Sequence, residues 1–239
     1  SMLENFETDP EPVYNDRYLS NYVIKTNVRD YDTDPVSREI IRKCMEAGHS
    51  DVFLTKALIA AAVFNVQSIV DLIASDYDKV NFENEDFYGI APGFTVAAIQ
   101  SGNFSMLKAL IMQGIYPDTP LTLATKTCER CPLNMVDEGI EFLRFLIVYR
   151  QEFDINQVTY DDGVRQYRLQ LLSSVLFSHR YEFPAFTELE QEERDQRIRE
   201  YRQKFVSFLL SLGADPDYPD YLGRTPRAIA LENGISMEA

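Results

Sequence analysis

The sequence has no run of apolar residues long enough to cross a membrane. A membrane-spanning helix needs about twenty consecutive apolar residues, and no stretch of this chain approaches that length. The N-terminal residues also lack the basic and apolar regions of a secretory signal. We therefore expect no direct insertion into a membrane and a cytoplasmic location.

Cysteine and positive charge are both scarce. The 239 residues include three Cys, and 23 Lys and Arg against 38 Asp and Glu, which gives a net charge of −15. Few cysteines without a signal peptide are typical of a reducing compartment. The negative charge argues against a protein that binds nucleic acid by neutralising phosphates. It favours a basic protein or peptide as the partner.

Motifs of catalysis and cofactor binding are also missing. The chain has no phosphate-binding loop, nucleophile elbow, HExxH motif or dinucleotide fingerprint. Cys128 and Cys131 have the spacing of half a zinc site, but a structural zinc ion needs four ligands. The remaining soft candidates are Cys44, His49 and His179. We expect no catalytic residues, no cofactor and no metal, with Cys128 and Cys131 as weak candidates for a metal.

The chain does contain a recurring pattern of turn residues. Gly, Asp, Asn and Pro cluster around Val80, Pro117, Ile155 and Pro216, which are 37, 38 and 61 residues apart. Apolar residues with helical spacing lie between these clusters. Repeats of this length predict a solenoid of helix pairs, in which stacking of neighbouring pairs supplies the core.

Signals for helix ends support these repeats. Thr119-Pro120 and Thr225-Pro226 are typical of helix starts, because Thr can cap free N–H groups and Pro suits the first helical position. Gly114 and Gly213 follow apolar stretches, where a left-handed residue is favoured. These signals place helix boundaries next to the turn clusters.

The spacing of apolar residues predicts individual helices. We expect a capping helix over residues 36–47, a helix pair broken at Asn65 and another around Gly102-Asn103. A longer outer helix is expected near residues 186–212, with Ile198, Tyr201, Phe205 and Phe208 on one stripe. Another outer helix contains Phe142, Phe145, Leu146 and Tyr149, and an inner helix contains Leu169, Leu172, Val175 and Leu176.

The segment from Val206 to Gly234 resembles an ankyrin repeat. It has Gly213-Ala-Asp215, then Gly223-Arg-Thr225-Pro226, Ala230 and Asn233-Gly234, in the order of that family. Other copies are degenerate, since Ala91 stands where the family has Thr and no Thr-Pro follows Gly163. The resemblance covers residues 36–236 and implies an all-α solenoid of four to five ankyrin repeats, joined by β-hairpin fingers.

Two parts of the chain are expected from this resemblance. Residues 1–33 have no helical period and are interpreted as an N-terminal arm, either disordered or packed on the array. Residues 34–239 are interpreted as the ankyrin-repeat domain. The family uses its fingers and inner helices to hold partner proteins, which implies a monomeric, non-catalytic protein–protein interaction module, a scaffold or adaptor. Alternatives are a cytosolic regulatory domain of a larger protein, such as a channel or multidomain enzyme, and a microbial effector that binds a host protein.

Acidic and aromatic residues are concentrated in the expected fingers. The first, third and fourth fingers carry −10 of the net charge of −15, with Tyr and Phe among the acids. Such a surface suits Lys- and Arg-rich segments through screened attraction and cation–π contacts. The candidate partner-binding residues are Glu83, Glu85, Phe87, Tyr88, Tyr116, Tyr160, Asp161, Asp162, Tyr218 and Tyr221.

A structural interpretation of the acidic residues stays open beside this one. Carboxylates at turn positions can accept hydrogen bonds from nearby backbone N–H groups, as expected for Asp86, Asp154, Asp215 and Asp220. Acidic residues can also serve solubility alone. The surplus that is free for binding then consists of Asp76, Asp78, Glu83, Glu85, Asp161, Asp162 and Asp217.

Overall fold

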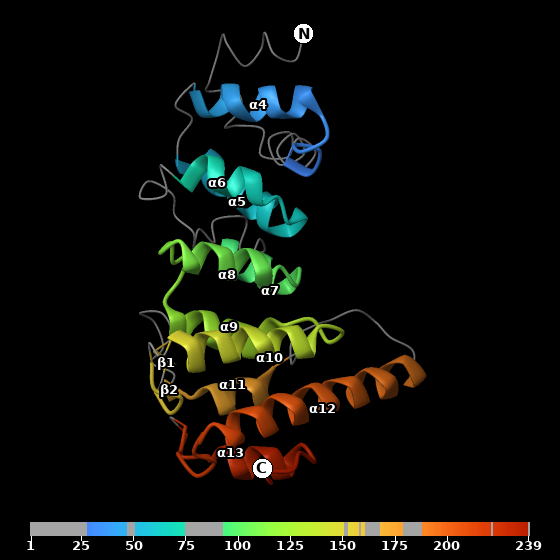
Figure 1. The fold of residues 1–239 in the computed structure, drawn as a ribbon. Coiled ribbons are helices and arrows are strands. Elements are labelled where there is room, and N and C mark those ends of the chain that lie inside the picture. Colours follow the sequence, from blue (N-terminus) through green and yellow to red (C-terminus); the bar gives the residue numbers. More distant parts are fainter. Residues whose placement is uncertain are drawn as a thin grey trace. The chain divides into compact units, whose positions relative to one another are not determined.

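The computed structural model describes residues 28–46, 51–74, 93–150, 153–157, 159–160, 168–178, 188–220 and 222–238. These residues are mainly helical (Figure 1), which confirms the expected helical class. Contacts divide the chain into two compact units, Ser1–Pro117 and Asp118–Ala239. Among the described residues, no helix has the length and apolar character that crossing a membrane requires.

In the described residues, the first unit contains one helix followed by two helix pairs. They are α4 (Pro35–Glu46), α5 (Asp51–Phe64), α6 (Gln67–Ala74), α7 (Phe94–Gln100) and α8 (Phe104–Met112). The helix predicted over residues 36–47 and both predicted helix pairs are therefore confirmed. Helix α5 packs on its own partner α6 and on α7 of the next pair, so the apolar faces of successive pairs share one core.

Two asparagines shape the turns of the first unit. Asn65 has a left-handed backbone with φ of 56°, a conformation that ends α5 and that Asn tolerates better than most residues. The N–H of Val66 then donates to the Ala61 carbonyl at 2.9 Å. The buried Asn103 side chain donates from Nδ2 to the Ala62 carbonyl. That bond ties the start of α8 to the last turn of α5.

The last residues of the expected N-terminal arm are ordered. Val28 is fully buried, and Ser68 Oγ on α6 donates to Asp32 Oδ1 at 2.5 Å. Asp34 then caps α4, since its carboxylate accepts from the N–H groups of Val36 and Ser37. Residues 1–27 lie outside the described residues.

The described part of the second unit begins with a helix pair and contains the longest described helix near its end. Its elements are α9 (Pro120–Arg130), α10 (Val136–Arg144), the π-helix η2 (Phe145–Arg150), β1 (Thr159–Tyr160), β2 (Arg168–Leu169), α11 (Leu171–Phe177), α12 (Glu188–Ser211) and α13 (Pro226–Glu232). The two short strands pair antiparallel. The long helix predicted near residues 186–212 is α12.

Two of the predicted helical segments differ in the structure. The outer helix expected to contain Phe145 and Leu146 is α-helical only to Arg144 and continues as the π-helix. Leu169, expected in an inner helix, lies in β2 opposite Thr159. Apolar residues three to four positions apart occur in a regular α-helix, in a π-helix and across the end of a strand that leads into a helix. The spacing of apolar residues therefore does not distinguish these structures.

Among the described side chains of α12, the buried ones begin at Ile198. Ile198, Tyr201, Phe205 and Phe208 are all buried, which confirms the predicted stripe. The described side chains of residues 191–197 are exposed or half-buried, and Figure 1 shows this half of α12 extending past α11 and α13. The packed half holds α12 in the core of the second unit.

Candidate functional site

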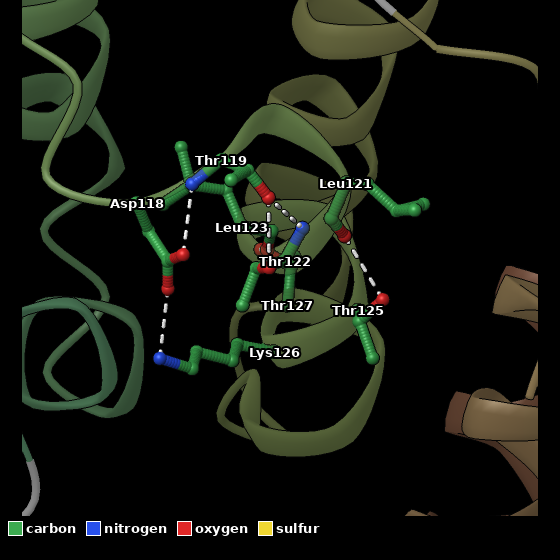
Figure 2. A network of polar contacts seen from close by, with 8 residues as sticks. All are labelled: Asp118, Thr119, Leu121, Thr122, Leu123, Thr125, Lys126 and Thr127. Carbon is green, nitrogen blue, oxygen red and sulfur yellow. Dashed lines mark hydrogen bonds and ion pairs between the residues drawn. The ribbon is translucent and has the colours of Figure 1, made fainter. Parts of the chain in front are cut away.

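The start of α9 is a dense polar network (Figure 2). Thr119 Oγ1 accepts from the N–H of Thr122 at 3.2 Å, and Pro120 takes the first helical position. The Asp118 carboxylate accepts from the N–H of Thr119 and from Lys126 Nζ, both at 2.8 Å. The Asp118 side chain is only 4 % exposed, so Lys126 neutralises a carboxylate that water hardly reaches.

The same capping recurs at α13. Thr225 Oγ1 accepts from the N–H of Ala228 at 3.2 Å, with Pro226 at the first position. Gly93 and Gln170, which precede α7 and α11, provide no side-chain cap. The predicted Thr-Pro helix starts are thus confirmed, whereas α7 and α11 begin without such a cap. Gly114 and Gly213 have φ of 81° and 91°, which confirms the left-handed ends.

Asn156 joins two loops of the second unit. Its Oδ1 accepts from the N–H of Asp215 at 2.7 Å, and its Nδ2 donates to the Gly213 carbonyl at 3.1 Å. The N–H of Asn156 itself donates to the Asp154 carboxylate at 2.8 Å. Both hydrogen-bonding groups of one amide side chain therefore hold a loop 57 residues further along the chain.

Asp220 organises the loop between α12 and α13, where the fourth finger is expected. The Asp220 carboxylate is fully buried and accepts from the N–H groups of Leu222 and Arg224 at 2.8 and 2.9 Å. Arg224 also donates to it from Nε and Nη2 at 3.1 and 2.9 Å. The guanidinium of Arg224 also lies over the Phe177 ring, with its central carbon 5.2 Å from the ring centroid. The structural interpretation of Asp220 is therefore supported by its contacts.

Asp217 is not a free carboxylate, which corrects the expectation that it belongs to the surplus. Arg227 on α13 donates to both of its oxygens, at 2.8 and 2.9 Å. These hydrogen bonds hold the pKa of Asp217 below its usual value. Asp154 and Asp215 likewise accept from backbone N–H groups two residues on. The two arginines neutralise Asp217 and Asp220, which weakens the attraction of this loop for a basic segment.

Three of the ten candidate partner-binding residues fall within the described chain. Tyr116 is half-buried in the first unit. Tyr218 in the second unit is 38 % exposed, and Tyr160 lies in β1 opposite Arg168. Outside the described residues are Glu83, Glu85, Phe87, Tyr88, Asp161, Asp162 and Tyr221.

The inner helix α11 offers little surface to a partner. All six residues from Leu171 to Leu176 are buried, including Ser173 and Ser174. Helix α11 packs against α9, α12 and α13. Within α11 only Phe177 is not buried.

Cys128 and Cys131 lie at the C-terminal end of α9 and are fully buried. Cys131 Sγ donates to the Met135 carbonyl at 3.2 Å, so the thiol is protonated. Burial raises the pKa of Cys131 to about 12 and that of Cys128 well above its ordinary value. Reactive CxxC pairs have the opposite setting, at helix N-termini that lower the pKa. These contacts assign both thiols to the core.

Nor do the described residues bring further ligands to these cysteines. In that part of the chain, no group of three or more His, Cys, Asp and Glu side chains could hold a metal ion. The side chains of Cys44, His49 and His179 lie outside it. Comparison of the chain with models of known protein families gives no match, and comparison with curated proteins gives none either.

Sequence reasoning missed two polar side chains of α12. The Tyr201 hydroxyl donates to the carbonyls of Thr127 and Cys128, at 3.2 and 3.0 Å, and so satisfies the end of α9. The buried Arg202 donates from Nη2 to the Ser178 carbonyl at 2.5 Å and from Nη1 to Asn233 Oδ1 at 3.3 Å. The apolar stripe predicted that Tyr201 is buried, but no sequence signal indicated these partners.

Proposed function

We propose that this chain is a non-catalytic protein–protein interaction module of the ankyrin-repeat type, which binds a partner with a basic segment through its acidic, Tyr-rich fingers. The partner-binding residues are those of the first and third fingers, with Tyr116 and Tyr218 as aromatic contacts. Cytoplasmic location belongs to the same proposal. The fourth finger contributes less charge, since Arg224 and Arg227 pair with its acids.

The observation that carries this proposal is the repeated construction of the helix pairs. Both Thr-Pro sites cap inner helices, both predicted glycines end outer helices in the left-handed region, and Asn156 bonds across 57 residues to the fourth finger. Such repeats stack through nearest-neighbour contacts and present loops in a regular series. A surface of this kind is suited to holding another protein, and the net charge of −15 favours a basic one.

The proposal is tested with a labelled peptide rich in Lys and Arg as the probe. We would measure its fluorescence anisotropy with the whole chain at low and high salt, beside a peptide in which Gln replaces the basic residues. The finger variant is Glu83→Gln/Glu85→Gln/Asp161→Gln/Asp162→Gln. The control is Glu192→Gln/Glu193→Gln/Asp195→Gln/Glu200→Gln on the exposed part of α12, which removes the same charge.

Specific finger recognition predicts that only the finger variant loses affinity, by at least about tenfold, roughly the effect of one or two strong charged contacts. Tyr88→Ala and Tyr160→Ala would then weaken binding further without changing its salt dependence. Equal losses in the finger and α12 variants would mean that the peptide responds to net charge alone. In that case the acidity serves solubility, and the proposed recognition is wrong.

A further inference from the structure

The sequence contains one Asn-Gly pair, Asn233-Gly234, directly after α13. In such a pair the asparagine side chain reacts readily with the backbone, because glycine has no β-carbon to shield its nitrogen or to restrict its dihedral angles. Gly234 is exposed and has φ of 66°, in the left-handed region that ends a helix. Water therefore reaches the backbone at the position where this reaction would start.

Two hydrogen bonds hold the Asn233 side chain. Its Nδ2 donates to the Ile229 carbonyl at 2.6 Å, and its Oδ1 accepts from Arg202 Nη1 at 3.3 Å. The bond to Ile229, four residues earlier, directs the amide back along α13 and away from Gly234. Arg202 is buried, and its Nη2 donates to the Ser178 carbonyl at 2.5 Å. The asparagine amide is thus held by a guanidinium that is itself fixed in the core.

The backbone nitrogen of Gly234 is held as well. Its N–H donates to the Leu231 carbonyl at 3.2 Å, and the N–H of Ile235 donates to the Ala230 carbonyl at 2.9 Å. Ile235 is buried and so anchors this turn. To attack Cγ of Asn233, the nitrogen must lose its proton and turn toward the side chain. The bonds of both the turn and the amide therefore have to open first.

We propose that Asn233 is a deamidation site, and that the hydrogen bonds of its side chain keep the reaction slow in the folded chain. In this reaction the Gly234 nitrogen loses its proton and forms a bond with Cγ of Asn233. The bond between Cγ and Nδ2 breaks, and Nδ2 takes up a proton and leaves as ammonia. Water then adds to one carbonyl of the cyclic imide, which gives aspartate or isoaspartate. Arg202 is a positioning residue, because it holds the amide away from the attacking nitrogen.

The reaction changes the end of α13. Both products lack the Nδ2 group, so the Ile229 carbonyl loses its side-chain donor. Isoaspartate also adds one carbon to the backbone, directly before the turn that Gly234 and Ile235 close. The modification therefore disturbs the contact by which Arg202 of α12 holds the end of α13.

Incubation of the whole chain at mildly alkaline pH tests this site. Peptide mapping by mass spectrometry measures the conversion of Asn233 over time, in the folded chain and in urea. Arg202→Met removes one bond of the amide. Arg199→Met, at an exposed position on the same helix, is the first control. Gly139→Ala is the second, because its β-carbon would crowd Cys131 in the same unit without changing the contacts of Asn233.

We expect both the unfolded chain and Arg202→Met to deamidate at Asn233 at least about tenfold faster than the folded wild type. Loss of a hydrogen bond from a charged donor shifts an opening equilibrium by about this factor. The two controls should stay much closer to the wild type.

An unfolded chain in which Asn233 does not convert would overturn the site, and a folded wild type that converts as fast as the unfolded chain would overturn the protection. Equal rates in Arg202→Met and Gly139→Ala would mean that general loss of stability sets the rate, which would overturn the role of Arg202. The reaction does not depend on the fingers, so this inference and the proposed function can fail separately.

Discussion

Gly139 shows how closely α10 approaches the end of α9. A β-carbon at this position would lie 2.5 Å from Cys131 Sγ and 3.1 Å from Cζ of Phe205. Neither neighbour can move freely, since Cys131 and Phe205 are fully buried. Glycine is therefore required here for space, and its backbone freedom has no part in the requirement. The buried cysteine is then a packing residue that fits against a residue without a side chain.

We expect Gly139→Ala to lower the free energy of unfolding by about 2 kcal/mol, as other insertions into packed cores do. Urea denaturation measures the change. The matched test repeats the substitution in a Cys131→Ala background, where the closest atom is gone, and the effect there should be at least halved. An equal loss in both backgrounds would show that the clash with Cys131 is not the cause.

Asp217 provides a prediction about pH. Its hydrogen bonds with Arg227 lower its pKa from an ordinary value of 3.8. A lowered pKa in the folded state means that the pair contributes stability above that ordinary value, and that the contribution disappears as the pH falls through the folded pKa. The pair is exposed on both sides, so its effect on global stability is small.

An NMR titration of the side-chain carboxyl carbons follows this group directly. In Arg227→Gln the pKa of Asp217 should return toward its ordinary value. Asp34 is the internal control, because its pKa is lowered chiefly by the hydrogen bond from Ser37 and should stay where it is. A pKa of Asp217 that is the same with and without Arg227 would contradict the ion pair.

Helix boundaries are the elements that the sequence predicted best. Thr119 and Thr225 act on N–H groups three residues away, and Gly114 and Gly213 act on their own backbone, so local chemistry is enough. Long-range partners were not predictable. Arg227 reaches Asp217 ten residues back, and Tyr201 bonds to a carbonyl 74 residues away. The acidic surplus was overestimated at the fourth finger for this reason, since charge counts do not show which cations pair.

Arg202 links three helices of the second unit. From α12 it donates to Ser178 at the end of α11 and to Asn233 at the end of α13. Helix C-termini leave carbonyl groups unpaired and carry partial negative charge, so one guanidinium stabilises two helix ends. The arrangement explains why a charged side chain lies in an otherwise apolar stripe.

We expect Arg202→Met to lower the free energy of unfolding by about 2 kcal/mol, because it leaves a buried carbonyl without its donor. Arg199→Met, at an exposed position on the same helix, should change it by less than about 0.5 kcal/mol. Denaturant titrations of both variants give the comparison. Similar values for the two would mean that the bonds of Arg202 contribute nothing beyond an exposed arginine.

At the scale of the whole molecule, the division into Ser1–Pro117 and Asp118–Ala239 predicts uneven stability. Repeat arrays are stabilised by contacts between neighbours, so a local substitution affects nearby repeats most. Gly139→Ala perturbs the second unit. Asn65→Ala perturbs the first unit, because the left-handed backbone conformation at this position costs alanine about 1 kcal/mol more than asparagine.

Native-state hydrogen exchange distinguishes local from global effects. Gly139→Ala should reduce the protection of amides in α11 and α12 more than in α5 and α7, and Asn65→Ala should do the reverse. A uniform loss of protection in either variant would mean that the chain opens as one cooperative unit. Loss of protection that stays near each substitution would instead support the nearest-neighbour stacking on which the proposed repeat architecture depends. Locally coupled helix pairs confine the effect of a substitution to its own surroundings.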